Sequence, residues 1–195
     1  DKNISGEERV DQVLRWLAGP EESRPHLFTL YFEYVYDHSH CYGPDSPENI
    51  AAIDRVDGYV GRLLDGIGSM PHADQVNVIL VSDHGQGKYL SDPQPFRLDE
   101  YVNISGATII EGGSHLAMHC ERDDPARAAD IVNTVNRNWE HGRAYTPAGT
   151  PRQWHVDANP RFPDVILGPD PGYAVLSTAR EAHRINKGDH GWAPE

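Results

Sequence analysis

Positive charge is scarce in this sequence. Lysine and arginine total 17 residues against 30 aspartate and glutamate residues, and the formal net charge is −13. A surface this negative repels nucleic-acid polymers and anionic lipids, so a protein that binds them through a basic patch is disfavoured. If the substrate is an anion, a local positive centre must bind it, and the 11 histidines leave room for a metal site.

Long apolar runs and cysteine are scarce too. No stretch approaches the ~20 apolar residues that a membrane-spanning helix needs, so no transmembrane segment is predicted. The sequence opens at DKNISGEERV, without methionine and without an apolar signal segment, which leaves the compartment open. Cys41 and Cys120 are the two cysteines, and the sequence does not tell whether they pair. The length of 195 residues suits one domain with a substantial core.

The first part of the chain alternates helical and strand-like patterns. Ser5 and Glu8 form a capping box that predicts a helix directly after it. Apolar runs at residues 27–36 and 76–82 predict two buried strands, and Ser46-Pro47 predicts the start of a helix between them. Strand, helix and strand in this order predict an α/β fold, with a mainly parallel sheet flanked by helices.

The pattern changes after about residue 90. Residues 106–121 alternate around a Gly-Gly pair and predict a hairpin, and Asp124-Pro125 predicts the start of a further helix. The run DVILGPD at residues 164–170 predicts a third buried strand. We therefore expect three segments: residues 1–90 as one part of the core, residues 91–155 as a small inserted α+β lobe, and residues 156–195 as the return to the core.

Histidines follow the predicted strands. Asp83-His84-Gly85 comes directly after the run at residues 76–82, and His40 comes just past the run at residues 27–36. Parallel sheets bind ligands at the carboxyl ends of their strands, and a carboxylate with imidazoles suits a zinc-type ion. His190, in GDHGW, adds a third segment with a histidine beside Gly and Asp. Taken alone, Asp83-His84-Gly85 is equally compatible with an ordinary polar turn.

Four blocks of the sequence together resemble the type I phosphodiesterase/nucleotide pyrophosphatase family of the alkaline phosphatase superfamily. These blocks are YFEYVYDHSHCYGPDSPENIAAIDRVDGYVGRLLDGI, NVILVSDHG, NPRFPDVILGPDPGY and KGDHGW. The resemblance implies a partial alkaline phosphatase-like core and a hydrolase that cleaves phosphodiesters or nucleotide pyrophosphates. It implies small-molecule phosphodiester or nucleotide substrates rather than nucleic-acid polymers. It also implies a periplasmic, secreted or cell-surface location.

The resemblance also implies a set of site residues. Two zinc ions are expected: Asp83 and His84 hold one of them together with an aspartate from an upstream segment. His40 and His190 hold the other, and Tyr31 matches a tyrosine that lines the nucleotide pocket in some bacterial members. The mechanism that the family implies is in-line displacement at phosphorus through a covalent phospho-enzyme.

Two departures from the family pattern accompany this resemblance. The family has an aspartate four residues before the histidine that matches His40, and Tyr36 stands there in this sequence. A phenol with an ordinary pKa of ~10 is a poor substitute for a carboxylate. Asp37 is a possible replacement ligand, although in an extended strand it would point to the other face. The threonine nucleophile and the upstream aspartate are expected before residue 1, so no catalytic residue is assigned here and fewer than two zinc ions remain an alternative.

Other histidines and two rival functions complete the sequence-based expectations. His115 and His119 are four residues apart, but the alternation around them predicts a strand rather than a metal-binding helix. His38 points away from a shared site if its stretch stays extended, and Cys41 lies outside the family pattern.

One rival to the phosphodiesterase function is a catalytically inactive relative that binds metal or nucleotide. The other is a related sulfatase or phosphomonoesterase, because those enzymes share the same types of metal ligand.

Overall fold

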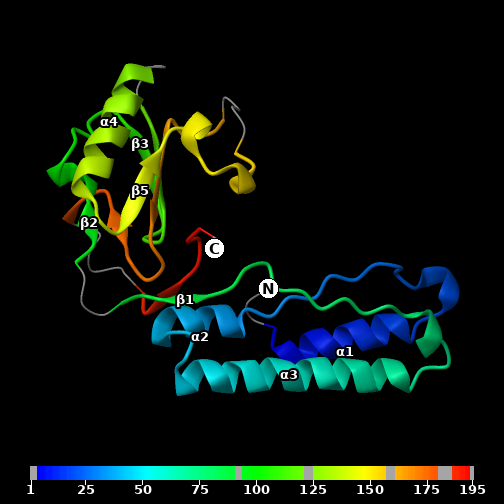
Figure 1. Ribbon diagram of the computed structural model, residues 1–195. Coiled ribbons are helices and arrows are strands. Elements are labelled where there is room, and N and C mark those ends of the chain that lie inside the picture. Colours follow the sequence, from blue (N-terminus) through cyan, green and yellow to red (C-terminus); the bar gives the residue numbers. More distant parts are fainter. Residues whose placement is uncertain (1–3, 91–93, 121–124, 157–160, 180–185, 194–195) are drawn as a thin grey trace. The chain divides into compact units, whose positions relative to one another are not determined.

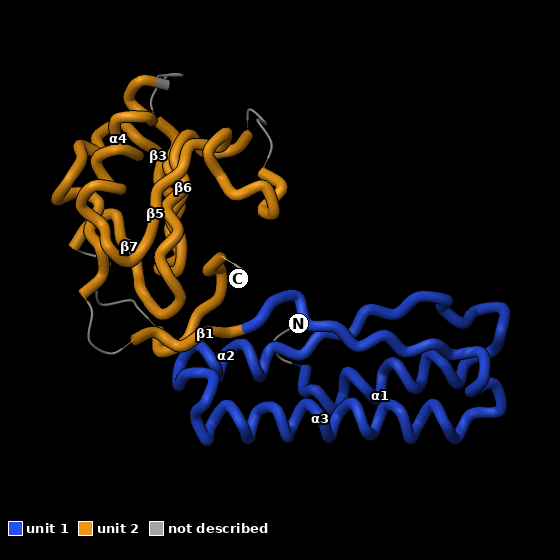
Figure 2. The backbone as a smooth tube through the Cα atoms, in the orientation of Figure 1, with its two compact units in different colours: residues 1–85 blue, residues 86–195 orange. Residues whose placement is uncertain are grey.

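The computed structural model describes residues 4–90, 94–120, 125–156, 161–179 and 186–193 (Figure 1). The chain divides into two compact units, Asp1–Gly85 and Gln86–Glu195, coloured blue and orange in Figure 2. We call them unit 1 and unit 2. The expected division into a core, a lobe ending at residue 155 and a returning core stays a prediction. Within the described residues, no helix combines the length and the apolarity that crossing a membrane requires.

Unit 1 is built on two long helices whose caps match the sequence pattern. Helix α1 spans Gly6–Leu17, and Ser5 caps it through a complete capping box with Glu8. Helix α3 spans Pro47–Gly68, and the Ser46 side chain accepts a hydrogen bond from the Asn49 backbone. Both predicted helices are therefore confirmed. The short 3-10 turns η1 and η2 span Glu21–Ser23 and Ala73–Gln75.

Helix α3 carries apolar residues on its exposed surface as well as on its buried one. Ile50, Ile53 and Leu64 are exposed, whereas Tyr59 and Ile67 are buried. Helix α1 packs on α3, and Gly6 of α1 makes room for Tyr59, since a Cβ there would lie 2.2 Å from the ring. The core of unit 1 joins the two helices to the extended chain beside them, through Val13, Leu14, Leu17, Phe28, Leu30, Leu63, Ile67, Met70, Ala73 and Val76.

The two strands predicted in unit 1 are wrong as assigned. Helix α2 spans Tyr34–Tyr42, so the second half of the run at residues 27–36 and the histidines after it are helical. Residues 27–33 and 76–82 have no strand assignment, and Figure 1 shows them as extended chain alongside α1 and α3. No backbone–backbone hydrogen bond joins residues 27–32 or 77–82 to any other residue that the structure describes. Their branched and aromatic composition is typical of strands, but strand pairing needs partners that these described residues do not provide.

A bidentate ion pair fixes the start of α2. The Arg9 guanidinium donates to both carboxylate oxygens of Glu33, at 2.5 and 2.8 Å, and also to the Tyr31 carbonyl oxygen at 2.7 Å. This contact lowers the pKa of Glu33 from 4.5 to about 2. Glu33 is the N-cap residue of α2, so the ion pair ties α1 to the chain that enters α2.

Unit 2 contains a four-stranded antiparallel sheet covered by one helix. Its order is β3 (Thr108–Glu111), β4 (Leu116–His119), β6 (Val165–Pro169) and β5 (Gly142–Tyr145), and helix α4 (Pro125–Asn138) packs against it (Figure 1). The predicted hairpin, the helix starting at Pro125 and the strand in DVILGPD are confirmed. However, β6 pairs antiparallel with β4 and β5, so it completes this sheet instead of extending a parallel one. The core contains Leu98, Leu116, Met118, Cys120, Ala128, Ile131, Val135, Trp139, Ala144, Val165, Leu167 and Val175.

Two short strand pairs bring distant parts of unit 2 together. Strand β1 (Gly87–Lys88) pairs antiparallel with β8 (Gly188–Asp189), and β2 (Phe96–Arg97) pairs parallel with β7 (Val175–Leu176). The 3-10 turns η3, η4 and η5 span Leu98–Glu100, Pro147–Gly149 and Arg152–Trp154. The β1–β8 pair places the GDHGW segment in unit 2.

Candidate metal-binding residues

Helix α2 brings Tyr36 and His40 onto one face, because they are one helical turn apart. Their ring centroids lie 4.3 Å apart, and His40 is buried. The Tyr36 ring also lies 6.3 Å from the His84 ring, centroid to centroid. Two predicted ligands from separate segments of unit 1 therefore flank one aromatic ring.

Asp83 and His84 present donor atoms suited to one ion. His84 Nδ1 lies 2.9 Å from the carbonyl oxygen of Gly85, a contact that needs the proton on Nδ1 and leaves Nε2 as the ligand atom. His84 Nε2 lies 3.7 Å from Asp83 Oδ1, and the Asp83 side chain is 74% exposed. Nitrogen and carboxylate oxygen at an open position are donors that zinc accepts, so these residues fit the expected ion.

The helical form of α2 changes the expectation for Asp37. Asp37 is three residues from His40, and residues three apart on a helix are neighbours rather than occupants of opposite faces. Asp37 is exposed in the first turn of α2. His38 Nδ1 contacts the Tyr34 carbonyl oxygen at 2.7 Å, and Cys41 is a free, exposed thiol, while Cys120 is free and buried. Asp37 thus stays a predicted replacement ligand.

Tyr31 presents an aromatic ring to solvent close to this group. It is 60% exposed. Partial desolvation, followed by the negative charge of Asp83, raises the pKa of Tyr31, so the phenol stays neutral and lies within electrostatic reach of the Asp83 carboxylate. An exposed neutral ring suits the predicted role of stacking on a nucleobase.

The remaining predicted ligand, His190, belongs to unit 2 and follows strand β8. The preceding residue, Asp189, is buried and accepts hydrogen bonds from the Tyr89 hydroxyl at 2.6 Å and from the His190 backbone at 2.8 Å. Burial, followed by the hydrogen bond to Asp189, raises the pKa of Tyr89 well above its ordinary value, so Tyr89 remains a donor. Asp189 was missed from the sequence, although its place before a His-Gly pair repeats that of Asp83.

The turn between β3 and β4 holds the backbone of His190. The fully buried Ser114 hydroxyl donates to the His190 carbonyl oxygen. Gly113 and Gly191 have φ values of 82° and 108°, which glycine adopts without strain. A Cβ on Gly191 would lie 3.0 Å from the Ser114 hydroxyl oxygen, so the two segments fit closely. Sequence analysis predicted only a hairpin turn here.

Replacing Ser114 with alanine is expected to destabilise unit 2 by about 1–3 kcal/mol, because the part-buried hydrogen bond from Ser114 to the His190 carbonyl is lost. Urea unfolding monitored by tryptophan fluorescence measures this change. Ser105→Ala, at an exposed serine of the same unit, is the control and should stay within about 0.5 kcal/mol. Equal stability of both variants would contradict the role of Ser114 as an anchor.

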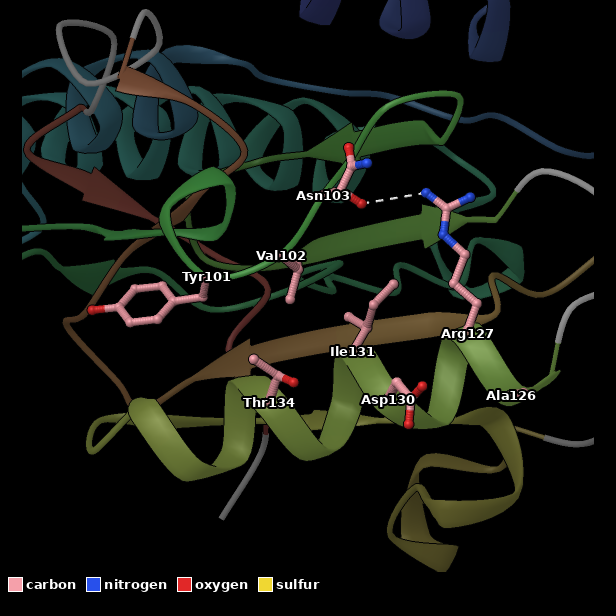
Figure 3. A pocket seen from close by; sticks show the side chains of 8 residues that line it. All are labelled: Tyr101, Val102, Asn103, Ala126, Arg127, Asp130, Ile131 and Thr134. Carbon is pink, nitrogen blue, oxygen red and sulfur yellow. Dashed lines mark hydrogen bonds between the residues drawn. The ribbon is translucent and has the colours of Figure 1, made fainter.

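Unit 2 contains a shallow pocket whose lining residues are separate in sequence from the predicted metal ligands. Figure 3 shows it between α4 and the segment before β3, lined by Tyr101, Val102, Asn103, Ala126, Arg127, Asp130, Ile131 and Thr134. Arg127 donates to the carbonyl oxygens of Asn103 and Ser105, at 3.3 and 2.9 Å. None of the predicted metal ligands lines this pocket, so it is not the candidate metal centre.

Comparison with solved structures shows the fold. Murine ectonucleotide pyrophosphatase/phosphodiesterase 5 superposes with a TM-score of 0.82 at 23% identity, over 99% of this chain and 50% of that one. An inactive variant of the same murine protein in complex with AMP superposes with a TM-score of 0.83. The predicted partial alkaline phosphatase-like α/β fold is thereby confirmed, although the strand pairs described within unit 2 are mostly antiparallel.

Sequence comparison identifies relatives along the whole chain. The chain is 31% identical to an uncharacterised pyrophosphatase/phosphodiesterase of Schizosaccharomyces pombe, over 87% of this chain and 36% of that protein. It is 31% identical to human ectonucleotide pyrophosphatase/phosphodiesterase family member 1, over 97% of this chain and 21% of that protein. A venom phosphodiesterase of Crotalus durissus collilineatus is 38% identical, over 100% of this chain and 24% of the venom protein.

The family assignment rests on the extent of the match. The family model described as type I phosphodiesterase/nucleotide pyrophosphatase matches residues 1–193. The chain spans at most 36% of the length of these three relatives, so its similarity concerns one part of each. The resemblance seen in the four sequence blocks is confirmed, and the chain belongs to the type I phosphodiesterase/nucleotide pyrophosphatase family.

Proposed function

We propose that the protein containing this chain hydrolyses phosphodiester or nucleotide pyrophosphate bonds, with Asp83, His84, His40 and His190 as zinc ligands. The observation that carries the proposal is the state of His84, whose Nδ1 is directed to the Gly85 carbonyl while Nε2 faces Asp83 Oδ1 at 3.7 Å. Histidine ligands of zinc are oriented in this way by a partner on the other ring nitrogen. Zinc bound here would neutralise negative charge on the phosphate oxygens.

The substrate that we propose is a small nucleotide or another phosphodiester. With a net charge of −13, the chain relies on its metal ligands to attract an anion, and polymeric nucleic acid would meet repulsion over a larger surface. Tyr31, with its exposed and neutral ring, is the proposed contact for the base. The murine relative has been solved in complex with AMP, which supports the proposal that the present protein also binds a nucleotide.

The nucleophile is proposed to come from outside these 195 residues. By family resemblance it is a threonine, accompanied by the aspartate that completes the ligand set of Asp83 and His84. The 195 residues alone are therefore expected not to turn over substrate. The relatives include ectonucleotide and venom enzymes by name, and we propose an exported or cell-surface location for this protein too.

A catalytically inactive relative is the second candidate function, and Tyr36 is the observation that favours it. The Tyr36 ring packs on His40 at 4.3 Å, in the position where the family has a carboxylate. Because Tyr36 stands where the family has a carboxylate, the ligand set lacks that carboxylate, and the zinc ion at His40 would be held more weakly. Such a protein would bind nucleotide or a single ion without hydrolysis.

The test is hydrolysis of three nitrophenyl compounds by the whole natural protein: a nucleotide diester, a phosphate monoester and a sulfate. We expect hydrolysis of the diester alone, loss of activity with a chelator and recovery with Zn2+. His84→Ala is expected to lower diester hydrolysis by about 100-fold or more, because losing a ligand exceeds the effect of losing its hydrogen-bonding partner. His26→Ala, at an exposed histidine of unit 1, is the matched control and should retain activity.

Each other outcome assigns a different function. Preference for the monoester or the sulfate would replace the proposal with a phosphomonoesterase or sulfatase. Hydrolysis of none of the three compounds by a protein that binds AMP would identify the inactive relative. Full activity of the His84→Ala variant would overturn the metal-ligand role of His84.

A further inference from the structure

An N-glycosylation sequon, Asn103-Ile104-Ser105, lies in unit 2 and contains none of the predicted metal ligands. A sequon is an asparagine followed by any residue except proline and then by serine or threonine. Isoleucine fills the middle position here, and Gly106 rather than proline follows the serine. Because three-residue patterns often arise by chance, the surroundings of Asn103 in the structure decide whether it suits a glycan.

The segment that contains the sequon alternates between the core and solvent. Val102 and Ile104 are partly buried and pack against the hydrophobic core of unit 2. Asn103 and Ser105, the two residues that define a glycosylation site, are both exposed. A glycan linked to Asn103 would therefore extend into solvent without displacing a side chain of this core.

Hydrogen bonds hold the backbone of the sequon. The Asn103 side-chain oxygen accepts a hydrogen bond from the Ser105 backbone at 2.9 Å, so the turn uses the oxygen and not the nitrogen that receives a glycan. Arg127 of α4 donates to the carbonyl oxygens of Asn103 and Ser105, at 3.3 and 2.9 Å. Figure 3 shows the Asn103 side chain directed away from α4. The sequon is thus anchored through its backbone while its amide group stays exposed.

The second sequon of the chain, Asn3-Ile4-Ser5, offers an internal comparison. Its asparagine lies outside the described residues. Its serine caps helix α1, where the Ser5 hydroxyl takes part in the capping box with Glu8. The structural argument for a glycan therefore concerns Asn103.

We propose that Asn103 carries an N-linked oligosaccharide in the natural protein. The inference rests on the exported or cell-surface location proposed above, because the export pathway supplies the transferase and the donor, an oligosaccharide on a lipid diphosphate. In the transfer, a bond forms between Asn103 Nδ2 and C1 of the first sugar, and the bond from C1 to the diphosphate oxygen breaks. The amide loses one proton, and the lipid diphosphate leaves with the bonding electron pair.

Peptide mapping of the whole protein from its natural source tests this assignment. Trypsin releases residues 98–122, and Asn103 is the only asparagine in that peptide. We expect the peptide to carry an oligosaccharide. Peptide N-glycosidase in heavy-oxygen water should then convert Asn103 to an aspartate that contains one heavy oxygen atom. An unmodified 98–122 peptide in the natural protein would overturn the proposal.

Two substitutions at Ser105, made in the same cells, separate the glycan from the fold. Ser105→Ala removes the sequon but keeps the backbone N–H that bonds to Asn103, so we expect the loss of one glycan with the stability of the polypeptide little changed. Ser105→Thr is the matched control, because threonine preserves the sequon and should keep the glycan. Equal glycan mass in the natural protein and in Ser105→Ala would also overturn the proposal.

The remaining outcomes separate this inference from the proposals on which it rests. A glycan at Asn3 but not at Asn103 would support export and overturn the assignment of Asn103 alone. Two unmodified sequons in a protein retained inside the cell would overturn the proposed location as well. Hydrolysis of the nitrophenyl diester is measured on the same material, so the phosphodiesterase function stands or falls independently of the glycan.

Discussion

Replacing Leu167 with alanine is expected to lower the free energy of unfolding of unit 2 by about 2–5 kcal/mol. Leu167 is fully buried in β6, directly opposite Leu116 on β4 and Ala144 on β5. The truncation leaves a cavity at the centre of the sheet, where the neighbouring strands are held by their hydrogen bonds and close it only partly. Urea unfolding monitored by the fluorescence of Trp139, which lies in the same core, measures the loss.

Ile110→Ala is the matched control for this experiment. Ile110 lies on β3 of the same sheet and is 57% exposed, so its truncation should change stability by about 0.5 kcal/mol. Similar losses at the two positions would show that β6 is not the centre of this core. A change in the urea dependence of the free energy would instead indicate an altered unfolded state.

Glu33→Gln is expected to destabilise unit 1 by up to about 3 kcal/mol at neutral pH, because Arg9 then lacks its charged partner. The folded-state pKa of Glu33 is about 2, below its ordinary value of 4.5. The stabilisation is therefore present above pH 4.5 and is lost as the pH falls towards 2. Hydrogen exchange of the α1 and α2 amides, measured between these pH values, should show a steep loss of protection in the natural chain and a shallower one in Glu33→Gln.

Asp11→Asn provides the comparison for Glu33→Gln. Asp11 pairs with Arg62 at 2.5 Å, but the two side chains are 37% and 54% exposed, and exposed pairs contribute about 0–1 kcal/mol. Its removal should leave the pH dependence of α1 and α2 unchanged. An equally steep loss of protection in Glu33→Gln would assign the acid sensitivity to other carboxylates.

Local signals in the sequence predicted the elements that depend on neighbouring residues. The capping box of Ser5 and Glu8 and the Ser46-Pro47 pair mark helices correctly, because a cap is formed within one turn. The hairpin at β3 and β4 is equally local. The run at residues 27–36 was misassigned because its composition fits a strand, while its second half forms α2 beyond the anchor at Glu33. That anchor is a contact with Arg9, 24 residues away, which no local pattern reveals.

The candidate site divides in the same way. His40, Asp83, His84 and His190 were predicted because the family motifs around them are contiguous. Ser114 and Tyr89 could not be predicted, since they reach the His190 segment only after β1 pairs with β8 and the β3–β4 turn closes on it. Whether Asp37 and His40 are neighbours on one face could not be predicted either, because it depends on α2 being a helix rather than a strand.

The extended segments of unit 1 have a consequence for association between copies of the chain. Leu27 and Ile79 are 82% and 85% exposed, and the backbone groups around them form no strand pair with the described residues. An open edge with apolar side chains is a template on which another strand can add, and two copies could supply it to each other. Mutual repulsion from the net charge of −13 opposes such pairing, and salt screens that repulsion. The acidic composition thus acts to keep these edges of separate copies apart.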